Sequence, residues 1–259
     1  MSAPSRRSAP ARPAAGATRR QPAPNGNAPN WRSVAAVTRA VVACEACPRL
    51  RSHCESVERE KRRAYQDETY WGKPVPAFGD PAARLVVVGL APGAHGANRT
   101  GRMFTGDSSG DWLYEALHRH GFAALPTSAS RDDGQQLRDC WITAAGRCAP
   151  PDNKPLPREL ERCRPYLAAE LRLLTRARVV LVLGRIAHEG YLRACGAWER
   201  LAARERPGFA HGAEHVMAGG VVLLSSFHPS RQNTQTGRLT RAMWHGVFER
   251  ARELVERGA

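Results

Sequence analysis

Four cysteines have spacing typical of a metal or redox site. They form a C-x2-C pair followed much later by C-x14-C, and they are Cys44, Cys47, Cys148 and Cys163. No secretory signal pattern is visible, so we expect a reducing compartment, where such spacing indicates metal or redox chemistry rather than disulfides. Four thiolates suit zinc or an iron–sulfur cluster equally well. Cys54 is the alternative ligand, whereas Cys140 and Cys195 are predicted to be buried structural thiols.

A glycine-rich loop is the second candidate site. It reads G-L-A-P-G-A-H-G-A-N-R-T-G-R-M-F-T-G-D from Gly89 to Asp107. Its glycines allow close backbone approaches, but Gly93 and Gly96 do not complete a dinucleotide fingerprint, which argues against a Rossmann-like nucleotide enzyme. Asp107 precedes a predicted helix and Phe104 lies three residues before it. The acid is either an ordinary helix cap or part of a pocket that holds a planar polar ring and a water.

The third candidate is the segment S-F-H-P-S, which contains His228. A histidine at the carboxyl end of a predicted strand, fixed by a following proline, faces the ligand crevice rather than the core. The run after it, R-Q-N-T-Q-T-G-R-L-T-R, holds three arginines among Gln, Asn and Thr: Arg231, Arg238 and Arg241. This composition suits phosphates and base edges, although an ordinary solvated loop has it too.

The elements that position these segments alternate between strands and helices. Continuous apolar runs predict four buried strands at residues 84–90, 140–145, 179–183 and 221–226. Helical periodicity or capping predicts helices at residues 31–50, from 108 or 109 to 117, 157–174, 184–196 and 238–257. The prediction is a three-layer α/β/α domain with a four-stranded, mostly parallel central sheet. Its ligand crevice lies beyond the carboxyl ends of the strands, where all the loops named above begin.

Length and charge limit the possible partners. The 259 residues are enough for one ordinary α/β core, and 39 Lys and Arg against 24 Asp and Glu give a net charge of +15. Such a surplus favours polyanionic partners. Residues 1–30 are rich in proline and arginine and contain no acid, which predicts a disordered basic arm, with an organelle transit peptide as the alternative. Residues 31–259 are predicted to form a single domain.

Three long motifs resemble one known family. The glycine-rich loop, the segment R-C-A-P-P-D-N-K-P and the segment H-P-S-R-Q-N-T-Q-T-G-R-L-T occur in the order found in the type-5 uracil-DNA glycosylases, the iron–sulfur B branch of that superfamily. The resemblance covers about residues 34–257 and includes the spacing of the four cysteines. It implies a monofunctional DNA repair glycosylase that excises uracil, and hypoxanthine or other deaminated bases, at the start of base-excision repair.

The resemblance also implies roles for individual residues. It implies that Cys44, Cys47, Cys148 and Cys163 hold a structural [4Fe-4S] cluster. Asp107 would orient the attacking water and His228 would donate to the departing base, while Phe104 would stack on it. Leu90, Ala91 and Gly93 match the first active-site motif, and Ala144 stands where many relatives have an asparagine, which predicts a looser pocket. DNA contacts are assigned to Arg231, Gln232, Asn233, Arg238 and Arg241, and the loop of residues 232–239 would wedge into the base stack.

The remaining expectations concern partners and alternatives. We expect a monomer that acts on double- and single-stranded DNA containing deaminated bases, in the cytoplasm of a bacterium, associated with the nucleoid and not with a membrane. The alternative is a non-catalytic iron–sulfur or zinc module that binds nucleic acid. Such a module would use the same cysteines and basic surface, but it would not require Phe104, Asp107 and His228 at crevice-facing strand ends.

Overall fold

One six-stranded sheet organises residues 30–257, the range that the computed structural model describes. Its strands are β1 (Phe78–Gly79), β2 (Leu85–Gly89), β3 (Cys140–Ala144), β4 (Val179–Leu183), β5 (Glu214–Val216) and β6 (Val222–Ser226), in the spatial order β1-β3-β2-β4-β6-β5. The four predicted strands are confirmed as the parallel centre of this sheet. Apart from residue 30, the predicted basic arm lies outside the described residues.

The prediction of four strands is incomplete, because β1 and β5 add antiparallel edges. β1 has two residues, both half-buried, and β5 has three, with Glu214 and Val216 exposed. Neither segment contains the continuous apolar run by which a fully buried strand is recognised. The two edges were missed because they contribute little to the core.

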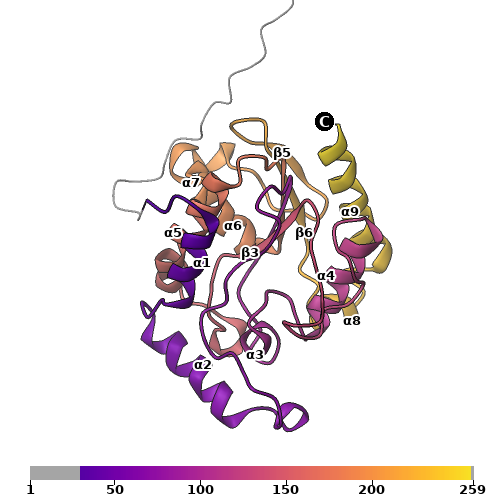
Figure 1. Ribbon diagram of the computed structural model, residues 1–259. Helices are drawn as coiled ribbons and strands as arrows, with labels where there is room; N and C mark the ends of the chain where they lie inside the picture. The colour runs from indigo at the N-terminus through magenta and orange to yellow at the C-terminus, as the bar shows by residue number, and fades with distance from the viewer. Residues whose placement is uncertain (1–29, 258–259) are drawn as a thin grey trace, which may run out of the picture.

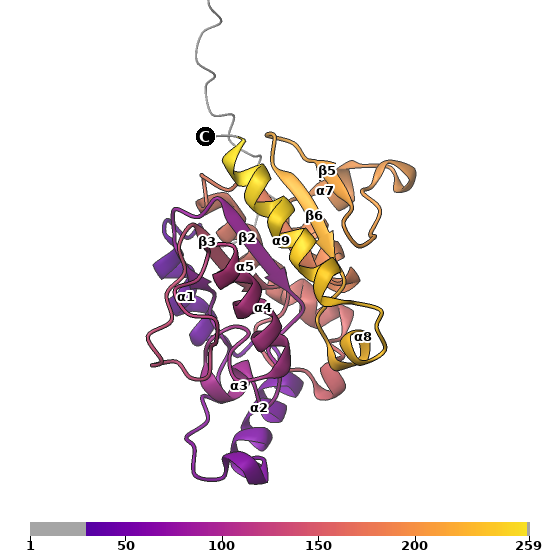
Figure 2. The same cartoon turned by 90° about the vertical axis from the view of Figure 1, so that its right-hand side faces the viewer.

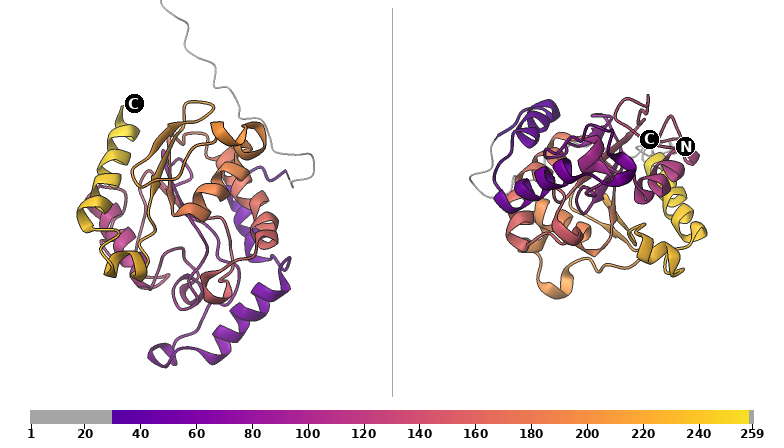
Figure 3. Two further views of the ribbon diagram at one scale, coloured as in Figure 1. Left: turned by 180° about the vertical axis from the view of Figure 1, so that it is seen from behind. Right: turned by 90° about the horizontal axis from the view of Figure 1, so that it is seen from below.

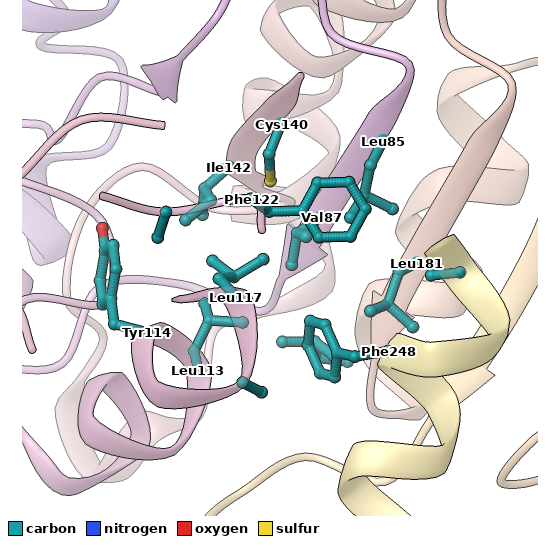
Figure 4. Packing of buried hydrophobic residues seen from close by; sticks show 14 of the residues in the cluster. Leu85, Val87, Leu113, Tyr114, Leu117, Phe122, Cys140, Ile142, Leu181 and Phe248 are labelled. Atoms are coloured by element: carbon teal, nitrogen blue, oxygen red, sulfur yellow. The ribbon is translucent and has the colours of Figure 1, made fainter. Parts of the chain in front are cut away.

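Alternation along the strands divides the core into two layers. On one face, Leu85 and Val87 pack against α4 (Ser108–Arg119) and α9 (Arg241–Glu256), as Figure 4 shows; Figure 1 shows both helices on the same side of the sheet. On the other face, Val86 and Val88 pack with residues of α5 (Pro157–Leu173) and α6 (Arg185–Ala194). A strand that is apolar on both faces must be covered by helices on both, so the predicted three-layer arrangement is confirmed.

The N-terminal region forms two helices where one was predicted for residues 31–50. They are α1 (Val34–Val42) and α2 (Pro48–Glu60), and they are separated by a turn that contains Cys44. The single-helix prediction was wrong because a proline disfavours helical geometry in the residue before it, and Cys47 has φ −123° and ψ 85°. α1 packs on α5 through Val37 and Val41.

Short helices complete the fold. They are α3 (Ala97–Thr100), α7 (Ala197–Arg200) and α8 (Arg231–Gln235), with 3-10 turns at Arg63–Tyr65, Pro151–Asn153 and Ala203–Glu205. α2 and α3 lie at the bottom of Figures 1 and 2, and α8 lies at the lower right, beneath α9; Figure 3 shows the molecule from behind in its left panel and from below in its right panel. No helix within residues 30–257 combines the length and apolar character that crossing a membrane requires.

The parallel register brings the predicted loops together. Gly89 pairs with Ala144 at the ends of β2 and β3, and Leu183 pairs with Ser226 at the ends of β4 and β6. Because these four strands are parallel, the segments that follow them leave the same edge of the sheet. This edge therefore carries the glycine-rich loop, the R-C-A-P-P segment and the His228 loop.

Candidate active site

Asp107 ends the glycine-rich loop and caps α4. Its Oδ1 accepts hydrogen bonds from the backbone N–H groups of Ser109 and Gly110, each at 3.0 Å. Within the described range no hydrogen bond is made by Oδ2, so the cap leaves one carboxylate oxygen for another contact. Burial raises the pKa of Asp107, and the two N–H groups oppose that rise. The carboxylate is therefore fixed in orientation by the start of a helix.

Two glycines let the loop backbone approach this carboxylate. A Cβ atom on Gly96 would lie 2.0 Å from Oδ2 of Asp107, and one on Gly93 would lie 2.9 Å from it. Both distances are too short for any side chain, so only glycine at these two positions lets the loop backbone lie against the Asp107 carboxylate. The sequence indicated close approach in this loop, and the structure identifies its partner.

Phe104 is held in an unusual backbone conformation beside Asp107. Its φ is 53°, in the left-handed region that residues other than glycine rarely adopt. Gly110 makes room for the Phe104 carbonyl, since a Cβ there would lie 1.9 Å from the oxygen, and Gly89 makes room for the ring. The Tyr114 hydroxyl donates to the carbonyl of Met103 at 3.0 Å. These contacts hold the loop in place and use Met103 as a buried anchor.

His228 follows β6 and faces Phe104. The two ring centroids are 6.2 Å apart, with 31° between the ring planes. Asn233 donates through Nδ2 to the backbone carbonyl of His228 at 2.8 Å, which fixes the backbone that carries the imidazole. Desolvation lowers the pKa of His228 to about 4, so the ring is neutral at pH 7. A neutral imidazole has one N–H to donate and carries no charge to be neutralised.

The two loops are tied to each other as well as to the sheet. The Ser109 hydroxyl donates to the carbonyl of Pro229 at 3.2 Å, and Nε of Arg231 donates to the Ser108 hydroxyl at 3.4 Å. Ser109 thus joins the start of α4 to the His228 segment. We did not predict this role, because a serine after a helix cap has no sequence pattern that reveals a distant partner.

The apolar residues of the first motif lie beside this group. Leu90 and Ala91 directly follow β2, and the Leu90 carbonyl accepts from the Gly146 backbone N–H at 2.8 Å. Ala144 ends β3 with only 1 % of its surface exposed. The side chains of Leu90, Ala91 and Ala144 therefore neither donate nor accept hydrogen bonds.

The basic residues after His228 differ in how far they are already engaged. Arg231 and Gln232 are exposed on α8. Arg238 is exposed as well, with its guanidinium 4.9 Å from the centre of the Phe227 ring. Arg241 lies 3.9 Å from the centre of the Trp112 ring and pairs with Glu115 at 3.0 Å. Arg241 thus already has two intramolecular partners.

Two arginines of the glycine-rich loop brace it from within, and the sequence did not reveal this. Arg99 donates to the carbonyls of His95 and Gly106, at 2.8 Å and 3.0 Å. Arg102 pairs with Asp133 at 2.6 Å. Both arginines are buried. The acidic partners of these arginines, Glu68 for Arg99 and Asp133 for Arg102, are 31 residues away in the chain, so no local sequence pattern reveals the pairs.

The predicted cysteine ligands come from three separate segments. Cys44 and Cys47 lie around the turn between α1 and α2, Cys148 follows β3, and Cys163 lies on α5. Arg162, next to Cys163, donates to the Ala46 carbonyl at 2.8 Å, so α5 holds that turn directly. Burial is the main reason why the pKa of Cys163 is raised to about 11, and the neighbouring Cys47 and Cys44 raise it further.

Cys54, the alternative ligand, is buried beside Cys148 and therefore lies close to the four predicted ligands. The Cys54 thiol faces the Ala149 carbonyl at 3.7 Å, and its interaction with Cys148 raises the pKa of the latter. Among the described side chains, no three His, Cys, Asp or Glu residues lie close enough together to hold a metal ion. The donor set nevertheless fits a thiolate-bound metal group, because its thiols are buried or half-buried and Arg51, Arg147 and Arg162 lie near them.

Comparison with known proteins decides the family. Residues 76–252 match the model of the uracil DNA glycosylase superfamily. The chain is 50 % identical over 213 residues to a type-5 uracil-DNA glycosylase from Mycobacterium leprae, covering 82 % of this chain and 91 % of that protein. It is also 50 % identical over 220 residues to the type-5 enzyme from Thermus thermophilus, covering 85 % and 97 %. The chain belongs to the type-5 uracil-DNA glycosylase family. The family also has archaeal members, since the type-5 enzyme of Pyrobaculum aerophilum is 46 % identical over 211 residues, covering 82 % of this chain and 88 % of that protein.

Family membership confirms the resemblance drawn from the three motifs and favours the enzyme over a non-catalytic module. The superfamily match contains the whole sheet, together with Phe104, Asp107 and His228. It begins after α1, α2 and the turn between them that holds Cys44 and Cys47. Phe104, Asp107 and His228 thus lie inside the matched part, whereas two of the four predicted cysteine ligands lie N-terminal to it.

Proposed function

We propose that this uracil-DNA glycosylase of base-excision repair hydrolyses the N-glycosidic bond of a flipped-out base with Asp107, His228 and Phe104. The observation that carries the proposal is that these three side chains come from two loops that leave the same carboxyl edge of the sheet. The rings of Phe104 and His228 face each other, and the hydrogen bond from Ser109 to Pro229 ties the two loops together.

Binding comes first. A base inside a duplex cannot be reached, and extruding it costs roughly a few kcal/mol, which the pocket must offset. Phe104 stacks on the extruded ring. Backbone N–H groups around Ala91 and Gly93 donate to the pyrimidine oxygens. The braced glycine-rich loop supports this step, because a stacking ring and fixed amides lose little freedom when the base arrives.

Bond cleavage then separates charge. Uracil leaves with the electron pair of the glycosidic bond, and the sugar becomes cationic at C1′. The neutral His228 donates a hydrogen bond to the uracil O2 as negative charge develops, and the Asp107 carboxylate stabilises the cation and orients the attacking water. Water oxygen bonds to C1′, the water gives up a proton through Asp107, and the uracil anion takes a proton from solvent.

The substrate range follows from the apolar wall. Leu90, Ala91 and Ala144 provide no side-chain hydrogen bond that would select uracil over a larger deaminated base. A pocket that lacks such a group rejects other bases weakly, because no buried polar atom is left unpaired by the wrong one. Hypoxanthine and other deaminated bases are therefore proposed as additional substrates.

DNA is gripped by the exposed part of the segment after His228. Arg231, Gln232 and Arg238 contact phosphates on either side of the flipped nucleotide. The segment proposed to wedge into the base stack is shorter than residues 232–239, because Leu239 is completely buried in the core and cannot enter the stack. Asn233 acts by supporting the His228 carbonyl, and Arg241 contributes less because Glu115 and Trp112 already engage it.

The cysteines hold a [4Fe-4S] cluster in this proposal. Its ligands are Cys44, Cys47, Cys148 and Cys163, and Cys54 lies beside Cys148. When bound, the cluster supplies a cross-link between the N-terminal helices and the sheet and takes no part in hydrolysis. Zinc is the competing occupant, since four thiolates suit it as well.

Two measurements test the proposal. Purified protein should be brown and contain iron. A uracil-containing duplex that has been incubated with it should be nicked by alkali at the abasic site, whereas a thymine-containing duplex should stay intact. A second duplex with hypoxanthine tests the wider substrate range. Failure to nick the uracil duplex, with a control glycosylase active in the same buffer, would refute the catalytic assignment. A colourless protein that contains zinc would refute the cluster.

A further inference from the structure

Arg147 is a buried cation with two unused donors. It follows β3 and directly precedes Cys148, and its side chain is 1 % exposed. Nη2 donates to Oε2 of Glu170 at 2.6 Å. Its Nε and Nη1 groups find no acceptor among residues 30–257. Leaving a buried charged donor unpaired is costly, so these two N–H groups indicate a partner other than the protein chain itself.

Glu170 holds Arg147 on the cysteine side of α5. Cys163 and Glu170 are seven residues apart, about two turns, and therefore lie on the same face of the helix. The same Glu170 oxygen also accepts from the Thr143 hydroxyl at 2.5 Å, which anchors the pair to β3. Arg147 directly precedes Cys148 in the chain, and its backbone N–H faces the Cys163 thiol. Arg147 is therefore a neighbour of two proposed cluster ligands.

Arg51 provides a contrast in the same region. Its side chain is 9 % exposed and its charge also acts on Cys148 and Cys54. Nη1 donates to the Gly72 carbonyl at 2.9 Å, and the other nitrogens pair with Glu45 and Glu55 at 3.3 Å. All its nitrogens therefore have protein acceptors. Burial near the cysteines does not by itself leave an arginine without partners.

We propose that Arg147 is a positioning residue for the cofactor, and that its Nε–H and Nη1–H groups donate hydrogen bonds to cluster sulfur atoms. This inference rests on the proposed binding of a [4Fe-4S] cluster by Cys44, Cys47, Cys148 and Cys163. Hydrogen bonds to sulfur and nearby positive charge stabilise the electron-rich cluster and raise its reduction potential. The Arg147–Glu170–Thr143 chain links this stabilisation to the strand that ends at Ala144, beside the base pocket.

The test compares holoprotein variants purified without oxygen and matched for iron content. They are Arg147→Met, Arg147→Lys and the control Arg51→Met. The readouts are the Fe–S stretching bands in resonance Raman spectra, the midpoint potential and the rate at which an iron chelator bleaches the visible absorption. Circular dichroism verifies that each variant is folded.

Arg147→Met should shift the Fe–S bands, move the midpoint potential to a more negative value and speed bleaching by about 10- to 100-fold, as for other outer-sphere partners of metal ligands. Arg147→Lys keeps the charge but loses the fork of donors, so it should recover part of the potential and not the Fe–S bands. If Arg147→Met cannot be obtained folded, the Lys variant carries the test through its Fe–S bands. Arg51→Met should keep the wild-type bands.

Wild-type bands and bleaching rate in folded Arg147 variants would overturn the inference while leaving the cluster in place. Equal shifts in Arg51→Met would also overturn it, because any buried cation would then have the same effect. A zinc-containing, colourless wild type would overturn both the cluster assignment and this inference. Loss of uracil excision in a brown wild type would bear on the catalytic assignment alone.

Discussion

The proposed base pocket and the cysteine region differ in how their polar groups are satisfied. Asp107 accepts hydrogen bonds from two backbone N–H groups, and Asn233 donates to the His228 carbonyl. Among residues 30–257, the buried Arg147 has no acceptor for its Nε and Nη1 groups. The chain alone therefore preorganises the proposed pocket, whereas the proposed cluster site needs a bound group to complete its hydrogen bonds.

Substitutions in the proposed base pocket and in the cysteine region should have different effects. Pocket variants should lose chemistry while they keep the fold, the iron and DNA binding. Cysteine variants should lose iron and stability first, with chemistry affected through the fold.

The largest effect on chemistry is expected for Asp107→Asn. The amide keeps an oxygen for the Ser109 and Gly110 N–H groups, so the cap and the fold should survive. Loss of the charge removes cation stabilisation and water orientation, which should slow single-turnover uracil excision by about 10²- to 10⁴-fold. Binding to uracil DNA, measured by fluorescence anisotropy, should change little.

The same variant tests the raised pKa of Asp107. The carboxylate must be ionised to act, so the wild-type excision rate should fall with decreasing pH, with an apparent pKa above the ordinary aspartate value. Asp107→Asn has no group to protonate there and should show no such fall. If the excision rate of the variant falls with decreasing pH as that of the wild type does, a group other than Asp107 causes the fall.

His228→Ala should cost somewhat less, about 10²- to 10³-fold in single-turnover excision, as for other donors that stabilise a developing anion. His228→Gln keeps a neutral donor and should recover part of the rate. Because the pKa of His228 is lowered to about 4, its protonation should not affect the rate between pH 5 and 8. A strong dependence in that range that disappears in His228→Gln would contradict a neutral donor.

How far the sequence predicts this molecule depends on where the partner of each residue lies. The four central strands are continuous apolar runs, and the Asp107 cap is a local pattern, so both could be predicted. The roles of Asn233, Ser109 and Arg147 depend on acceptors that only the folded chain brings near. The break between α1 and α2 was foreseeable from Pro48, whereas β1 and β5 are too short and too exposed to leave a pattern.

Cys163→Ala tests the other region, with Cys195→Ala as the matched control. Loss of a ligand should remove the iron and lower the free energy of unfolding by more than about 3 kcal/mol, as for other structural metal sites. Cys195 lies near the end of α6 and fits no ligand spacing, so its variant should keep the iron. Excision per folded molecule should fall less than in Asp107→Asn. Normal iron content in Cys163→Ala would favour Cys54 as the ligand.

A moderate effect is expected for Gly89→Ala, with Gly246→Ala as the control. The new Cβ would lie 2.7 Å from the Phe104 ring, which must then move out of its stacking position. Loss of base stacking is worth about 1–3 kcal/mol, or roughly tenfold or more in affinity for a flipped base. At Gly246 nothing lies within 4 Å of the new atom, and alanine favours helix α9. Equal affinities in the two variants would remove Phe104 from base binding.

The smallest effects are expected at the basic residues, where an arginine that donates only to a hydroxyl, Arg231, is compared with one that pairs with a carboxylate, Arg241. Arg231→Ala should reduce the slope of log affinity against log salt by about 1, because one phosphate contact is lost. Arg241→Ala should reduce the slope less, since Glu115 already neutralises that charge and Trp112 holds the guanidinium. Glu115→Gln removes the competing carboxylate and should steepen the slope of the otherwise unchanged protein. Equal slopes for Arg231→Ala and Arg241→Ala would mean that DNA displaces Glu115, and that the ion pair does not decide which arginines bind phosphate.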